Sequence, residues 1–245
     1  MSQTLKNKIA VVTGASRGIG RATALRLAQE GAEVFVHYSA SKDAADSLVK
    51  DIAGFGSKAH AVHADLNDNQ GAEKLASQIP GTIDILVNNA GVAEYVSFED
   101  TTPEQFDKLF NVNVKSLYFV TQKLAKKINN GGRIVNISSV VARVNFAGVP
   151  AYSATKGAVN TLTVHLAALF GEREITVNSI SPGAIETDMS AWLRNEQGEA
   201  TARQIQAIPR VGRAEDIADA VAAIAGPDGR WITGQVIEVS GGTKL

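Results

Sequence analysis

The chain has no cysteine among its 245 residues. This absence excludes disulfide bonds, thiolate metal ligands and a cysteine nucleophile. Long hydrophobic runs are also missing, since no apolar stretch approaches the roughly 18 residues that a membrane-spanning helix needs. The first residues show no basic segment followed by an apolar one, so no export signal is predicted. We therefore expect a cytoplasmic protein without a membrane partner.

Positive and negative charges are nearly balanced, with 24 Lys and Arg against 25 Asp and Glu, and the formal net charge is −1. The basic residues are scattered along the chain, which argues against a nucleic-acid partner. Of the four histidines, His60 and His63 lie three apart on an expected strand, where their side chains should face opposite sides. No metal site is predicted, and the expected partner is a small molecule.

Short apolar segments rich in β-branched residues alternate with helical patterns along nearly the whole chain. The expected strands are residues 8–12, 33–37, 58–63, 83–89, 132–138, 175–181 and 235–240. The expected helices are residues 21–32, 43–55, 72–79, 103–128, 152–170 and 215–226. This alternation is typical of a parallel sheet with helices on both faces. We expect one α/β domain over residues 1–245, in which the irregular stretch 188–211 forms a lid over the substrate.

The first expected strand runs into the glycine-rich stretch TGASRGIGRA, where a helix begins. Gly14, Gly18 and Gly20 have the spacing G-x3-G-x-G at this turn. Glycines there permit a tight turn and let a pyrophosphate approach the backbone N–H groups of the helix N-terminus. An ordinary glycine-rich turn is the alternative. The position after the first strand of an alternating chain favours a nucleotide site at the switch point of the sheet.

The end of the second expected strand indicates which nucleotide binds. An NAD site usually places an acidic residue there, where it binds the ribose hydroxyls. This chain has Tyr38 at that position, between His37 and Ser39, and Glu33 lies at the other end of the strand. The residues that can donate hydrogen bonds to a 2′-phosphate are Arg17, Ser39, Ser41 and Lys42. NADP(H) is therefore favoured over NAD(H).

Five motifs occur in order along the chain: TGASRGIG, NNAG at 88–91, NVNVKS, NISS and YSATK. With SPGAIETDM at 181–189 and SGG near the end, the chain resembles the short-chain dehydrogenase/reductase family over essentially its whole length. The resemblance implies a doubly wound Rossmann-type domain with a seven-stranded parallel sheet, a nicotinamide cofactor and usually a homotetramer. It assigns the catalytic roles to Asn113, Ser139, Tyr152 and Lys156.

These residue types suit hydride transfer between a nicotinamide and a carbonyl carbon. The carbonyl oxygen must gain a proton, and Tyr152 is the expected acid or base. Free tyrosine has a pKa of about 10, and an ammonium on Lys156, one helical turn away, should lower that pKa. Ser139 would donate a hydrogen bond to the substrate oxygen. By the resemblance, Lys156 also binds the nicotinamide ribose and Asn113 marks a helix break that holds a water; a satisfied buried residue is the alternative for Asn113.

The resemblance also implies which residues form the rest of the cofactor site. Asp65 should meet the adenine amino group with Leu66 beside it, and Ile185 and Thr187 should hold the nicotinamide carboxamide. Asn89 can equally be interpreted as a residue that braces the sheet. The complete expected cofactor set is Gly14, Ser16, Arg17, Gly18, Ile19, Gly20, Tyr38, Ser39, Ser41, Asp65, Leu66, Asn89, Ala90, Gly91, Tyr152, Lys156, Pro182, Gly183, Ile185 and Thr187.

Substrate identity depends on segments that match no motif. Residues 92–96, 140–149 and 188–211 should wall a mostly apolar pocket. Its expected members are Ser139, Val141, Val144, Phe146 and Trp192. Such a pocket suits a medium-sized ketone, an acyl chain or a ring system.

The expected function is NADPH-dependent reduction of a ketone or an aldehyde. The branch of the family that looks closest is 3-oxoacyl-(acyl-carrier-protein) reductase. Arg173 matches one of its carrier-docking positions, but Asn130 stands where a second basic residue is expected. A non-catalytic NADP-binding sensor is a further alternative, although a sensor does not need a complete Asn, Ser, Tyr and Lys set.

Overall fold

The computed structural model describes residues 3–245, so Met1 and Ser2 of the expected domain range lie outside the described residues. The described strands form one parallel sheet in the order β3-β2-β1-β4-β5-β6-β7, which confirms the expected doubly wound fold. The strands are β1 (Ile9–Val12), β2 (Glu33–Tyr38), β3 (Ala59–His63), β4 (Ile83–Asn88), β5 (Ile128–Ile137), β6 (Thr176–Pro182) and β7 (Val236–Val239). The α-helices are α1 (Gly18–Gln29), α2 (Lys42–Gly54), α3 (Gly71–Ser77), α4 (Pro103–Phe110), α5 (Ser116–Ala125), α6 (Pro150–Phe170), α7 (Glu196–Ile205) and α8 (Ala214–Ala225).

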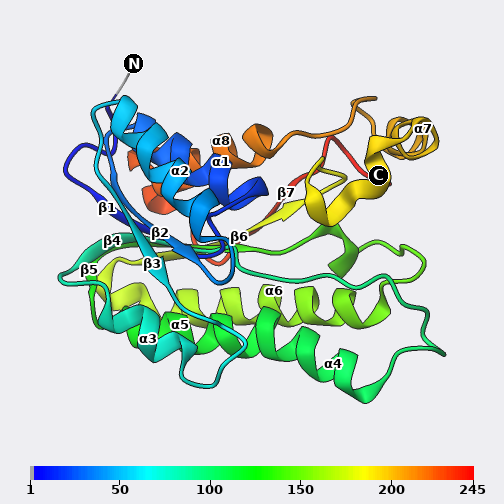
Figure 1. Cartoon of the computed structure of the whole chain (residues 1–245), viewed down its shortest axis with the longest axis horizontal. Helices are drawn as coiled ribbons and strands as arrows, with labels where there is room; N and C mark the ends of the chain where they lie inside the picture. Colours follow the sequence, from blue (N-terminus) through cyan, green and yellow to red (C-terminus); the bar gives the residue numbers. More distant parts are fainter. Residues whose placement is uncertain (1–2) are drawn as a thin grey trace.

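Two layers of helices cover the sheet (Figure 1). Helices α1, α2 and α8 lie on one face, and α3, α4, α5 and α6 lie on the other. The central strand β4 is buried along all six of its residues, as an apolar strand between two layers must be. Each face has its own apolar core: Leu27 and Leu48 belong to the first, and Leu75 and Leu124 belong to the second.

The strand order creates a switch point in the middle of the sheet. The chain leaves β1 toward β2 on one side, whereas it leaves β4 toward β5 on the other. The carboxyl ends of the neighbouring strands β1 and β4 therefore flank a crevice, which is where doubly wound sheets bind nucleotides.

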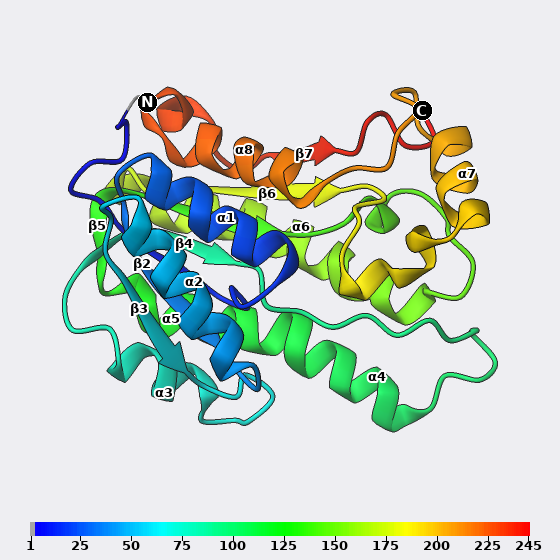
Figure 2. The same cartoon turned by 45° about the horizontal axis from the view of Figure 1, so that its top comes forward.

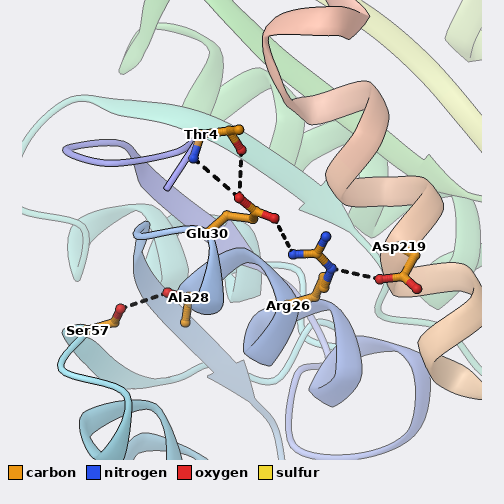
Figure 3. A network of polar contacts seen from close by, with 6 residues as sticks. All are labelled: Thr4, Arg26, Ala28, Glu30, Ser57 and Asp219. Carbon is orange, nitrogen blue, oxygen red and sulfur yellow. Dashed lines mark hydrogen bonds and ion pairs between the residues drawn. The ribbon is translucent and has the colours of Figure 1, made fainter. Parts of the chain in front are cut away.

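The helix that begins at this switch point, α1, is anchored at its far end by a polar network (Figure 3). Arg26 donates to Asp219 of α8 through Nε at 2.7 Å and to Glu30 through Nη1 at 2.5 Å. Glu30 also accepts hydrogen bonds from the backbone N–H and the hydroxyl of Thr4, at 3.3 and 2.9 Å. Exposed ion pairs contribute only about 0–1 kcal/mol each. The main effect of the network is therefore to set how α1 lies against α8.

The helix expected over residues 103–128 is interrupted. Helix α4 ends at Phe110, residues Asn111–Lys115 form a π-helical segment, and α5 ends at Ala125. Strand β5 begins at Ile128, before the expected start at residue 132, because it carries a bulge opposite Asp84. π-Helical bulges are frequent at functional sites, and this one contains Asn113.

The stretch 188–211 contains helical structure that the sequence pattern did not reveal. A 3-10 segment, Asp188–Arg194, precedes α7, whose first turn is capped by the Asn195 side chain accepting the Gly198 N–H at 2.8 Å. Figure 2 shows α7 beside the C-terminus, beyond the carboxyl ends of the strands. Within residues 3–245, no helix combines the length and the apolar character that crossing a bilayer requires.

Candidate active site

Three glycines shape the loop between β1 and α1. Gly14 and Gly18 have φ values of +62° and +54°, in the left-handed region that favours glycine. At Gly20, a Cβ would lie 2.3 Å from the carbonyl oxygen of Gly14 and 2.4 Å from Nδ2 of Asn89. Helix α1 begins after Arg17 with no side-chain cap and no acidic residue in its first turn. Its first N–H groups therefore have no capping side chain, which suits an anion site.

Asn89 braces this loop from the end of β4. Its Nδ2 donates to the carbonyl oxygens of Thr13 and Gly14 at 2.9 and 3.0 Å. The backbone N–H groups of Asn89 and Ala90 both donate to the Thr13 hydroxyl at 2.9 Å. These contacts agree with the structural interpretation of Asn89.

Arg17 links the loop to the stretch 188–211. The residues Ser16 and Ile19 around it are half-buried, whereas the Arg17 side chain is 72% exposed. Its Nη1 atom lies 4.0 Å from Oδ2 of Asp188, so the guanidinium can leave this weak contact and bind an anion.

Strand β2 ends without a carboxylate. Tyr38 is half-buried at its end, Ser39 is exposed, and Ser41 is half-buried just before α2. The ammonium of Lys42 is 2.5 Å from Oδ2 of Asp46, one turn along α2. Within residues 3–245, the two serine hydroxyls donate to no protein group and Arg17 makes only its weak contact with Asp188, so these three donors can bind a ligand.

The adenine side of the expected site lies after β3. Asp65 is exposed, and its Oδ1 accepts the Asn67 N–H at 2.9 Å. Leu66 beside it is 6% exposed and packs in the second core. Asp65 therefore keeps its other carboxylate oxygen available to a ligand.

The expected nicotinamide end follows β6, which ends at Pro182. Gly183 lies so close to the turn after β7 that a Cβ would be 2.7 Å from a threonine hydroxyl. Ile185 is 6% exposed. A Cβ on Gly18 would lie 3.4 Å from Cγ2 of Thr187, so the glycine loop and the nicotinamide end are neighbours.

Asn113 is 1% exposed within the π-helical segment. Its Oδ1 accepts the Val92 N–H at 2.8 Å, and its Nδ2 donates to the Val92 carbonyl at 2.9 Å and to the Thr155 hydroxyl at 3.1 Å. A Cβ on Gly91 would lie 3.2 Å from this Oδ1 and 3.7 Å from Nζ of Lys156. Asn113 is a satisfied buried residue, and it fixes the loop that borders Lys156.

Tyr152 and Lys156 come from the first turns of α6. Lys156 is 5% exposed, and its Nζ lies 5.5 Å from the centroid of the Tyr152 ring. The same Nζ donates to the carbonyl oxygen of Ile137, at the end of β5, at 2.9 Å. Ser139 follows that strand, and its hydroxyl lies near enough to the Tyr152 phenol to lower the pKa of that phenol. The structure thus brings the expected Ser, Tyr and Lys together, with Asn113 next to the Lys.

Burial determines the protonation of this group. Burial raises the pKa of the Tyr152 phenol well above its usual value, nearby Tyr95 raises it further, and the Ser139 hydroxyl opposes the increase. Burial also lowers the pKa of Lys156 to about 8. The expected decrease in the pKa of Tyr152 is therefore wrong for the chain on its own, because desolvation of the phenolate dominates. Tyr152 carries its proton at neutral pH.

Three expected pocket residues lie between Ser139 and α6. Val141 and Val144 are half-buried, and the Val141 N–H is 3.4 Å from Oγ of Ser139. The Phe146 ring lies under the ammonium of Lys244, whose Nζ is 4.0 Å from the ring centroid. This contact ties the segment 140–149 to the end of the chain.

Trp192 connects the stretch 188–211 to the loop after β4. Its Nε1 donates to the Tyr95 hydroxyl at 3.2 Å. Tyr95 is 58% exposed and raises the pKa of the Tyr152 phenol, so it links Trp192 electrostatically to the expected catalytic residues. Sequence reasoning named only the range 92–96 and missed Tyr95, although an aromatic residue in that range was a usable signal.

Comparison with known proteins identifies relatives along the whole chain. The family described as enoyl-(acyl carrier protein) reductase matches residues 14–244. An uncharacterised oxidoreductase of Methylorubrum extorquens is 42% identical, covering 98% of this chain and 99% of its own. Versicolorin reductase of Emericella nidulans is 38% identical, covering 97% of this chain and 96% of its own. The solved structure of the angucycline C-6 ketoreductase LanV with bound NADP has a TM-score of 0.95 and 39% identity, covering 100% of this chain and 98% of that one.

A doubly wound parallel sheet with a glycine loop at its switch point, beside a half-buried Tyr152 and a buried Lys156, defines an NAD(P)-dependent oxidoreductase. The family match and the relatives named above make the assignment more specific. The chain belongs to the short-chain dehydrogenase/reductase family, as the sequence motifs indicated.

Proposed function

We propose that this protein reduces a ketone or an aldehyde to an alcohol with NADPH, and that Tyr152 donates the proton. The observation that carries the proposal is the grouping of Ser139, Tyr152 and Lys156 beside Gly91, at the end of the crevice that the glycine loop begins. The names of the relatives, versicolorin reductase and angucycline C-6 ketoreductase, support a carbonyl substrate.

The residues present fit NADP(H). The left-handed Gly14 and Gly18 and the uncapped start of α1 suit the pyrophosphate. Arg17, Ser39 and Ser41 suit a 2′-phosphate, because β2 ends without a carboxylate that would repel it. LanV was crystallised with NADP, which supports the same preference. The remaining residues of the expected cofactor set keep their proposed roles, and the bound cofactor supplies the hydride.

Tyr152 enters the reaction with its proton, because burial raises the pKa of its phenol. It donates this proton to the carbonyl oxygen while Ser139 donates a hydrogen bond to the same oxygen. Lys156, with a pKa lowered to about 8, is still largely cationic at pH 7 and stabilises the tyrosinate that the transfer leaves. The same ammonium would also bind the nicotinamide ribose of the bound cofactor.

A free ketone fits better than an acyl chain on a carrier protein. Arg173, the expected docking residue, donates to Oδ1 of Asn130 at 3.1 Å and to the Ala125 carbonyl at 2.8 Å, and it also binds the Ile128 carbonyl. These contacts hold the guanidinium at the amino end of β5. The proposed site lies at the carboxyl ends of the strands, so Arg173 is on the opposite side of the sheet from the site. A non-catalytic sensor has no observation in its favour.

We propose a fused-ring ketone as the substrate class and the stretch 188–211 as its lid, within one domain that spans the chain. Trp192 from this stretch binds the hydroxyl of Tyr95 from the loop after β4, and Tyr95 is close enough to Tyr152 to raise the pKa of its phenol. Flat apolar side chains favour flat apolar ligands, because rings stack with offset geometry. Relatives named for versicolorin and angucycline support this class.

Trp192→Ala is expected to raise KM for a fused-ring ketone such as 2-tetralone by about tenfold, because a stacking contact is lost. The KM for a small acyclic ketone should change little. Steady-state NADPH oxidation measures both KM values. With the wild-type protein in the same assay, NADH should give a lower kcat/KM than NADPH. Trp231→Ala is the matched control, since Trp231 is 94% exposed and outside the site. Equal KM values for both tryptophan variants would contradict the assigned ring contact.

We also propose that the protein is a homotetramer. Apolar side chains on the outer surfaces of α5 and α6 support this, since Tyr118, Phe119 and Val164 are 42%, 40% and 52% exposed. Exposed apolar patches of this kind typically mark interfaces.

A further inference from the structure

His37 is a buried titratable residue that the proposed mechanism does not use. It is the penultimate residue of β2 and is 2% exposed. Its ring bridges two cofactor loops. Nδ1 lies 2.9 Å from the backbone nitrogen of Gly14, and Nε2 lies 3.0 Å from the carbonyl oxygen of Ala64. A buried imidazole with both nitrogens engaged is fixed in position.

The two partners determine the tautomer of this ring. The Gly14 N–H can only donate, so Nδ1 must accept; the Ala64 carbonyl can only accept, so Nε2 must carry the hydrogen. Only the neutral imidazole with hydrogen on Nε2 satisfies both contacts. A protonated ring would place its Nδ1–H against the Gly14 N–H. Burial accordingly lowers the pKa of His37 to about 4.

The groups that His37 joins lie at opposite sides of the adenosine crevice. Gly14 opens the glycine loop with a left-handed φ of +62°, and its carbonyl is held from the other side by Asn89 at 3.0 Å. Ala64 immediately precedes Asp65, the residue expected at the adenine. The backbone carbonyl of His37 also accepts the Ala15 N–H at 2.8 Å. One side chain thus sets the distance between the two loops.

We propose that His37 is a positioning residue for the cofactor, because its neutral ring holds the Gly14 N–H and the Ala64 carbonyl at a fixed separation. The inference rests on the proposed use of a dinucleotide. Two titratable neighbours act on the ring among the described residues. They are His63, the last residue of β3, and Asp65, two residues after it, and their effects on the pKa of His37 are opposite and smaller than that of burial. The glycine loop presents the backbone N–H of Gly14 to the ring, and the N–H of Ala15 to the backbone carbonyl of His37.

Two variants separate the two contacts. In His37→Asn, Oδ1 replaces Nδ1 and still accepts from Gly14. In His37→Gln, the amide reaches the position of Nε2 and still donates to Ala64, but the Gly14 N–H loses its acceptor. We expect His37→Gln to weaken NADPH binding about tenfold relative to His37→Asn, because it leaves a buried donor unsatisfied. The kcat at saturating NADPH should be similar in both, since neither changes Tyr152 or Lys156.

Hydrogen exchange of the peptide over residues 13–20, measured without cofactor, tests the contact itself. Exchange should be faster in His37→Gln than in His37→Asn. Equal NADPH affinity together with equal exchange in the two variants would overturn the proposal. Failure of the proposed function is a different result: the wild type would not consume NADPH with any carbonyl substrate, whatever the exchange rates.

The pH dependence of stability gives a second readout for variants that fold poorly. The pKa of His37 is lowered from 6.5 to about 4 in the folded chain. Between these values the unfolded chain binds a proton that the folded chain does not, so stability falls as pH falls. From pH 7.5 to pH 5, the unfolding constant of the wild type should rise about 30-fold more than that of His37→Asn. If the unfolding constants of both proteins had the same pH dependence, the inference that His37 is buried as a neutral ring would be overturned.

Discussion

Tyr152→Phe is expected to lower kcat for ketone reduction by about 10³-fold, while the Kd for NADPH changes by less than about threefold. Phenylalanine keeps the ring on α6 and removes only the hydroxyl that transfers the proton. Ser139 and Lys156 retain their positions, so substrate and cofactor still bind. Single-turnover absorbance at the NADPH band measures the chemical step, and fluorescence titration measures binding.

Tyr118→Phe is the matched control for this variant. This variant also loses one tyrosine hydroxyl, but from α5, where Tyr118 is 42% exposed and away from the site. Its kcat should therefore equal that of the wild type. A Tyr152→Phe protein with the wild-type rate would remove Tyr152 as the proton donor. An equal loss in both variants would point to a general effect of the hydroxyl deletions on folding or assembly.

Gly20→Ala is expected to raise the Kd for NADPH by at least about 30-fold and to lower the melting temperature. The new Cβ would lie 2.3 Å from the Gly14 carbonyl oxygen and 2.4 Å from Nδ2 of Asn89. Relief of this overlap must displace the glycine loop or its brace, and such overpacking typically costs about 1–3 kcal/mol. Fluorescence titration and a thermal melt measure the two effects.

Gly54→Ala provides the comparison, because a Cβ on Gly54, the last residue of α2, has nothing within 4 Å. Alanine has the higher helix propensity, so this variant should melt at or slightly above the wild-type temperature and bind NADPH normally. If Gly20→Ala also binds NADPH normally, the close approach at Gly20 does not support the cofactor loop.

The alternation of strands and helices along the chain and the ends of most elements could be predicted because they depend on local patterns. Residues 83–89 read as a doubly buried strand, and β4 is indeed buried throughout. The helix break at Asn113 could be placed, but not its π-helical form, because that form depends on the contacts of Asn113 with Val92 and Thr155. The helix α7 was missed since the stretch around it shows no apolar period.

Site residues could be predicted where their type and spacing imply a chemical role. They could not be predicted where the role depends on a contact that only the folded chain makes. Tyr152 and Lys156 have a recognisable spacing, and the structure places them together. The direction of the pKa shift of Tyr152 was wrong, because burial is a property of the folded chain. Tyr95 and His37 act through partners distant in sequence, Trp192 and Gly14, and no local pattern reports such pairs.

The most direct test of carbonyl reduction is to trace the hydride. Wild-type enzyme, 2-tetralone and NADPH deuterated at both C4 positions are incubated, and the product is analysed by NMR and mass spectrometry. Ketone reduction predicts an alcohol with one deuterium on the carbinol carbon, and a protonated solvent-exchangeable hydroxyl that Tyr152 supplied. An enone substrate run in parallel should also be labelled at its carbinol carbon. Deuterium at the alkene carbon of the enone, with no labelled alcohol from either substrate, would contradict the proposed reaction.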